Sequence, residues 1–206
     1  VIRCMNPFRK ESLQVAGRSH EFIDTRGARY RPRSQRPARH QAVQYDPTMV
    51  ERFPEIEGTS LSLVEHRIPG TLAGQMNLLL IAFRQWQQRD VDTWVPTAVA
   101  LAEEYAGFRA YELPVISRAY RPVSGFIDGG MRSGIPDPGV RDSTITIYLD
   151  RKRFLRARDI DSVGEIVPML VTPDGTILWR TRGRMTDDGD QGLRAAVEKL
   201  LGRSSP

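Results

Sequence analysis

The chain has little of the side-chain chemistry that metal and thiol sites require. It contains one cysteine, Cys4, among 206 residues, so these residues can form neither an intramolecular disulfide nor a cysteine metal cluster. Its three histidines are His20, His40 and His66. We therefore expect no metal, no cofactor and no catalytic triad based on histidine.

Long hydrophobic runs are also missing. The longest apolar run, Leu78 to Phe83, is far shorter than the roughly 20 residues of a membrane-spanning helix. The first residues lack an apolar stretch followed by a small-residue cleavage site, so we expect no signal peptide. These features favour a cytoplasmic protein, and peripheral attachment to a membrane stays open.

Positive charge is concentrated near the N-terminus. Residues 1–48 hold ten of the 30 basic side chains but four of the 25 acidic ones. The remainder is nearly neutral, so we expect the folded domain not to bind nucleic acid. The segment 26–39 is rich in arginine and has almost no apolar side chains, a composition that predicts disorder.

Three interpretations of residues 1–48 stay open. They form a disordered tail, or a translation start assigned too early, or a basic arm that binds RNA or a membrane surface. The second is prompted by Val1 in the first position and by Met49 just ahead of the first patterned segment. In each case the folded domain comprises residues 49–206.

Hydrophobic patterning from residue 50 onward predicts an α/β domain. Residues 53–63 form an extended first segment broken at Gly58, and an amphipathic helix covers residues 91–105. The continuous apolar run 77–83 predicts a strand that is covered on both faces. Further strands are expected at residues 108–116 and 144–150.

The second half of the chain predicts one irregular region and a closing hairpin. Residues 117–143 are expected to be irregular, with a short helix left open ahead of a glycine-rich loop at residues 128–134. Residues 151–158 are expected to form a short basic helix. Pro173-Asp174-Gly175 joins two predicted antiparallel strands, and a last helix starts near Thr186 or Asp187. The expected architecture is a central mixed sheet of about five strands with an antiparallel C-terminal hairpin, flanked by helices.

This order of elements, with the closing segment LVTPDGTILWRTRG, resembles the thioredoxin-like superfamily over residues 53–202, especially its peroxiredoxin and thiol–disulfide reductase branch. The branch carries its reactive cysteine at the start of the first helix, where residues 85–92 here hold neither Cys nor Ser. The cis-proline of the family would fall on Ile166. We therefore predict that the chain is not a thiol–disulfide oxidoreductase or thiol peroxidase, and we favour a protein that is not an enzyme.

A finer resemblance rests on FPEIEGTSL and LLLIAFRQWQQRDVDTWVP, which are similar to the ATP synthase assembly factor family of mitochondria. The resemblance implies a chaperone-like assembly protein with a protein partner, such as a subunit of a membrane complex. Our leading hypothesis is such a binding or assembly protein without thiol redox activity. The alternative is an enzyme that uses no thiol, with a pocket between the first-helix turn and the 128–134 loop.

The candidate binding surface follows from the topology, because the carboxyl ends of parallel strands meet at one edge of a sheet. Trp86 lies in a polar turn, and two interpretations of it stay open: an exposed anchor for a partner, or a cover over the core. The other members come from that turn and from the glycine-rich loop: Arg84, Gln85, Gln87, Gln88, Asp128 and Arg132.

Two further features carry open alternatives. Glu112 interrupts an apolar strand, and we expect either a buried ion pair with Arg118 or Arg121 or a solvated strand end. The basic helix 151–158 is the second choice for an interaction surface, against a simple solvated face. The oligomeric state is not predicted.

Overall fold

The structure is a computed structural model that describes residues 51–150, 154–155 and 162–201. The predicted disordered tail, residues 1–48, lies outside the described residues. So does most of the predicted basic helix 151–158, of which Phe154 and Leu155 are described and helical.

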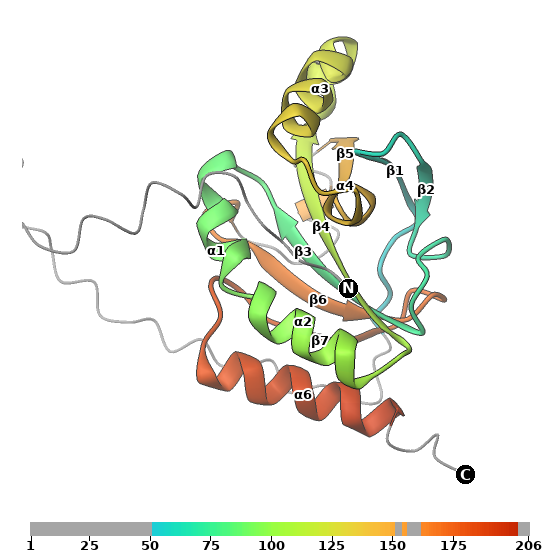
Figure 1. Ribbon diagram of the computed structural model, residues 1–206, viewed down its shortest axis with the longest axis vertical. Coiled ribbons are helices and arrows are strands. Elements are labelled where there is room, and N and C mark those ends of the chain that lie inside the picture. The colour runs from blue at the N-terminus through green and yellow to red at the C-terminus, as the bar shows by residue number, and fades with distance from the viewer. Residues whose placement is uncertain (1–50, 151–153, 156–161, 202–206) are drawn as a thin grey trace, which may run out of the picture.

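The described residues form one seven-stranded mixed sheet in the order β2-β1-β5-β4-β3-β6-β7 (Figure 1). The central strands β3, β4 and β5 are parallel, and every other neighbouring pair is antiparallel. The predicted mixed sheet with a C-terminal hairpin is confirmed, with seven strands in place of about five. The strands are β1 (Ile56–Ser60), β2 (Glu65–Ile68), β3 (Met76–Ala82), β4 (Phe108–Ser117), β5 (Ile145–Leu149), β6 (Val167–Val171) and β7 (Ile177–Arg180).

Strand β3 is the centre of the core. All seven of its residues are buried, as the continuous apolar run predicted, because both faces of the sheet are covered there. Leu79 and Ile81 belong to the apolar cluster on one face, and Leu78 and Leu80 to the cluster on the other. The helices α2 (Val95–Glu104) and α6 (Asp187–Leu201) run side by side across the second face (Figure 1).

The predicted helix over residues 91–105 is divided into two. A 3-10 turn, η2 (Gln85–Gln87), leads into α1 (Gln88–Asp92), and α2 starts after a break at Thr93 and Trp94. The Thr93 hydroxyl occupies this break, donating to the Asp90 carbonyl at 2.6 Å and accepting from the Met185 amide at 2.8 Å. Trp94 is fully buried, so the predicted core packing of this tryptophan is confirmed.

The C-terminal part follows the predicted signals closely. Gly175 has φ +89°, the left-handed conformation that the turn between β6 and β7 requires. Thr186 precedes α6, and its hydroxyl accepts the amide of Gly189 at 3.1 Å, which places the N-cap where it was predicted.

Two predictions of local structure are wrong. Gly58 does not break the first segment but lies inside β1, paired with His66. A Cβ atom on Gly58 would lie 2.7 Å from the Ile145 side chain, so glycine is needed there for the close approach of β1 to β5. Residues 128–134 do not form a loop, because they belong to helix α3 (Ser124–Gly134).

The helix α3 is part of a protruding helical region. It follows the 3-10 helix η3 (Arg118–Val123) and precedes α4 (Pro138–Ser143). Every residue of η3 and α3 is at least partly exposed, and Figure 1 shows α3 beyond the end of β4 and away from α1. In the described part of the chain, no helix combines the length and the apolar character needed to cross a bilayer.

Candidate functional site

The turn that begins the first helix is fastened by the side chain of Gln87. Gln87 is fully buried, and its Oε1 accepts the backbone amides of Phe83 at 2.7 Å and Arg84 at 3.0 Å. Its Nε2 donates to the carbonyl of Val163 at 2.9 Å, in the segment that precedes β6. Gln87 was predicted on the binding surface, and the structure corrects this: its amide satisfies three backbone groups in the interior.

Trp86, by contrast, points outward. Its side chain is 60% exposed, which decides between the two interpretations of this residue in favour of the exposed one. Arg84 and Gln85 beside it are also exposed. The turn therefore presents one large aromatic side chain with polar neighbours, next to a glutamine that holds the backbone in place.

Gln88 connects the start of α1 to the central sheet. Its Nε2 donates to Oε2 of Glu112 on β4 and to Oδ1 of Asp92 on α1, both at 3.3 Å. The expected ion pair of Glu112 with Arg118 or Arg121 is not the arrangement found, and neither is a solvated strand end. The carboxyl group of Glu112 instead lies beneath α1 and shares an amide with a second carboxylate.

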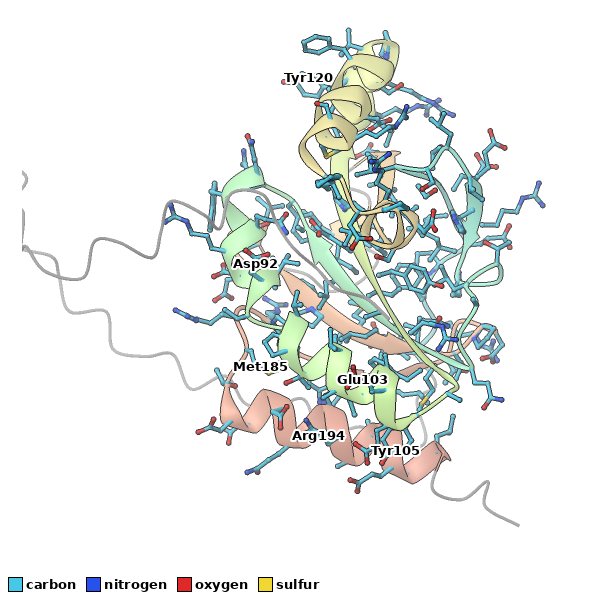
Figure 2. All side chains as sticks on the ribbon, viewed as in Figure 1. Asp92, Glu103, Tyr105, Tyr120, Met185 and Arg194 are labelled. Carbon is cyan, nitrogen blue, oxygen red and sulfur yellow. The ribbon has the colours of Figure 1, made fainter. Side chains whose placement is uncertain are left out.

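The environment of Glu112 perturbs its ionisation. Burial raises the pKa of this carboxyl group to about 7, the negative charge of Asp92 adds to the increase, and the hydrogen bond from Gln88 opposes it. A carboxyl group with a pKa near neutrality can give or take a proton under physiological conditions. In Figure 2, Asp92, whose charge contributes to this pKa, lies on α1 and far from Tyr120 on η3.

The face of β4 around Glu112 is partly open. Glu112, Pro114 and Ile116 are half-buried, whereas Leu113 and Val115 on the other face of the strand are buried. Between α1 and the η3–α3 region, solvent therefore reaches these alternate side chains of β4, which point to the same face of the sheet. No single sequence signal marked the Gln88–Glu112 contact, since it joins residues 24 positions apart.

The two remaining members of the predicted surface lie on α3. The Tyr148 hydroxyl donates to Oδ1 of Asp128 at 3.0 Å, and Nε of Arg132 donates to the carbonyl of Leu61 at 2.8 Å. Burial, together with the hydrogen bond to Asp128, raises the pKa of Tyr148. These contacts attach α3 to β5 and to the β1–β2 turn, on the half of the sheet away from the first-helix turn.

A large groove lies on that same half. It has a volume of about 1010 Å³ and is bounded by β1, β2, β5 and the η3–α3 region. Among the described residues its lining includes Asp128 but none of residues 84–88. The structure therefore does not bring the two parts of the predicted surface into one pocket.

A comparison with known proteins finds solved structures that are similar to this chain. No protein-family model matches the chain. No curated protein matches it either. A "putative electron transfer protein" from Aquifex aeolicus VF5 is similar at a TM-score of 0.53 and 12% identity, over 72% of this chain and 95% of that protein. This chain has a thioredoxin-like fold.

Two other similar structures are a thiol:disulfide interchange protein from Bacteroides sp. and the thioredoxin domain of a thiol-disulfide oxidoreductase from Bacteroides vulgatus. The first has 18% identity and a TM-score of 0.46, over 76% of this chain and 91% of that one. The second has 17% identity and a TM-score of 0.47, over 70% of this chain and 94% of that one.

These names contradict our prediction that the chain is not an enzyme and, in particular, not a thiol–disulfide oxidoreductase or thiol peroxidase. Similar structures from Bacteroides sp. and Chlorobium tepidum are named as thiol:disulfide interchange proteins. The prediction relied on the turn at residues 85–92, which holds no cysteine. The one thiol of the chain, Cys4, lies outside the described residues.

Proposed function

We propose that this chain is a thioredoxin-fold binding protein that engages a protein partner through the first-helix turn. The observation that supports the proposal is the 60% exposure of Trp86 on that turn. Large aromatic side chains are among the strongest anchors in protein interfaces, because they bury much apolar area for few rotatable bonds.

The fixed backbone of the turn supports the same proposal. The three hydrogen bonds of Gln87 tie it to the segment that follows β3 and to Val163, so the backbone beneath Trp86 is already ordered. An anchor on an ordered backbone loses less conformational entropy on binding than one on a loose loop. Arg84, exposed beside it, adds a charged group for the rim of an interface.

An assembly role at a membrane complex is the finer form of this proposal. It rests on the similarity of FPEIEGTSL and LLLIAFRQWQQRDVDTWVP to the ATP synthase assembly factor family, and the comparisons do not support it. A cytoplasmic location stays a prediction as well.

Affinity capture with the full chain tests the proposal. Tagged protein, a Trp86→Ala variant and a Leu63→Ala control should be expressed in the native cell, and the retained proteins quantified by mass spectrometry. Leu63 is a suitable control because it is 65% exposed on the β1–β2 turn. We expect Trp86→Ala to reduce the specific partner by about tenfold or more, since truncating an anchor costs about 2 kcal/mol. Equal recovery with all three proteins would contradict the proposal.

A second candidate function, an enzyme without a catalytic thiol, is favoured by Glu112. A carboxyl group with a pKa of about 7 beside a second carboxylate can act as a general acid or base. Any activity found in a substrate screen should then change with pH near neutrality and be lost in Glu112→Gln. Glu103→Gln is the matched control, because Glu103 is exposed on α2 (Figure 2). Activity that survives Glu112→Gln would contradict this candidate.

A further inference from the structure

The groove beside β5 is lined by residues of two neighbouring strands, β1 and β5, which pair over a short length. In the described chain, β1 and β5 are joined by two residue pairs, Thr59 with Thr146 and Ser60 with Ile145. At this closed end the strands are in close contact, as the 2.7 Å approach at Gly58 shows. Beyond Gly58 the two strands are no longer paired, and residues of both line the groove of about 1010 Å³, together with residues of β2 and of the η3–α3 region.

Along the groove, the strands β1 and β5 each have a strand partner on one side. Residues 56 and 57 of β1 pair with β2, and residues 148 and 149 of β5 pair with β4. On the groove side, the described residues offer these two segments no strand partner. An unpaired strand edge is a template for another extended chain, since its N–H and C=O groups match those of a strand.

The two faces of the groove differ in chemistry. On one face the lining is apolar, because Ile56, Leu149 and Phe154 belong to the apolar cluster there. On the other face lie Tyr148, bonded to α3, and Arg121 from η3. Successive side chains of an extended chain point to opposite faces, so a matching occupant would alternate apolar and polar residues.

Thr146 supplies an independent sign of a missing ligand. It lies at the closed end of the groove and is 1% exposed, and its hydroxyl has no hydrogen-bond partner among the described residues. Buried hydroxyl groups in folded proteins nearly always have a partner. A polar main-chain group of an occupant that reaches the closed end would satisfy this hydroxyl.

We propose that this groove binds an extended segment of a partner protein by strand addition between β1 and β5. The segment has alternating apolar and polar side chains, which face the apolar cluster and the η3–α3 region respectively. This site is separate from the Trp86 turn, so it does not depend on the function proposed for that turn.

The direct test uses a fluorescein-labelled synthetic peptide of about eight residues, with valine alternating with threonine or lysine. Its binding to the full chain is measured by fluorescence anisotropy, beside the same peptide N-methylated at alternate residues. We expect a Kd below about 1 mM for the first peptide and at least about tenfold weaker binding of the second, which lacks the main-chain donors along one edge. Equal binding of the two peptides, or no binding of the first, would overturn the proposal.

Two variants locate the peptide. Thr146→Val and Ile56→Ser should each weaken binding about fivefold or more, because the first removes the unpartnered hydroxyl and the second part of the apolar face. Val64→Ser is the control, since Val64 is 52% exposed on the β1–β2 turn and does not line the groove. Thr146→Val keeps the side-chain shape, so it serves if Ile56→Ser does not fold.

Trp86→Ala separates this proposal from the proposed function. It should leave binding of the peptide unchanged, whereas loss of binding in Trp86→Ala alone would place the peptide at the turn and overturn the groove. Unaltered binding in both Thr146→Val and Ile56→Ser would overturn it as well.

Discussion

Replacing Glu112 with glutamine should change how the stability of the protein depends on pH. In the folded protein the pKa of this carboxyl group is about 7, against 4.5 for the same group without the fold. The folded state therefore favours the protonated carboxyl group, and this stabilisation is complete below pH 4.5. It is lost as the pH rises toward 7, because the unfolded chain releases its proton at a lower pH than the folded one does.

The magnitude follows from the difference between the two pKa values. One pKa unit corresponds to about 1.4 kcal/mol, so the loss for Glu112 between pH 4.5 and 7 is on the order of 3 kcal/mol. Glutamine at this position keeps a similar shape but does not ionise. We expect Glu112→Gln to become progressively more stable relative to the wild type over this pH range.

Urea unfolding at a series of pH values measures the effect. The free energy of unfolding of the wild type, of Glu112→Gln and of the exposed control Glu103→Gln should be compared at each pH. The wild type and Glu103→Gln should run parallel. A difference between the wild type and Glu112→Gln that stays constant between pH 4.5 and 7 would refute the reasoning about burial beneath α1.

Three further predictions concern single side chains. Gln87→Leu should lower the free energy of unfolding by about 2 to 4 kcal/mol in urea, because it leaves one buried and two partly buried backbone groups without this partner, and a loss below about 0.5 kcal/mol would show that the turn does not need this amide. Thr146→Val should raise the melting temperature, as removing an unpartnered buried hydroxyl stabilises by about 1 kcal/mol, and a lower melting temperature would mean that the hydroxyl has a partner. Any reduction of insulin disulfides by the pure chain should disappear in Cys4→Ser, since Cys4 is its one thiol, and activity that survives would mean that the assay detects something other than this chain.

Much of the sheet could be predicted from local pattern. A few residues are enough to predict the apolar strand β3 and the Pro-Asp-Gly turn, because burial on both faces and a left-handed turn each require particular residue types. The helix at α3 could not be predicted this way. Its glycines at positions 125, 129, 130 and 134 lower helix propensity, and its contacts to Leu61 and Tyr148 come from distant parts of the chain.

In the candidate site, too, the features with a local sequence pattern could be predicted and those that depend on distant contacts could not. An exposed tryptophan in a polar turn is visible in the sequence as one of two alternatives, and only burial decides between them. The role of Gln87 depends on Val163, 76 residues away, and that of Gln88 on Glu112. Such contacts have no local sequence signature. The sequence of the turn alone does not distinguish a polar side chain that contacts a distant strand from one that faces solvent.

Photo-crosslinking in the native cell tests the central claim most directly. The photoreactive amino acid p-benzoylphenylalanine replaces Trp86 in one full-length variant and Phe126 in another, a matched aromatic position that is 87% exposed on α3. The account predicts a discrete protein adduct from position 86 after irradiation, and no such adduct from position 126. An adduct from position 126 alone, or from neither position, would contradict a partner-binding surface at the first-helix turn.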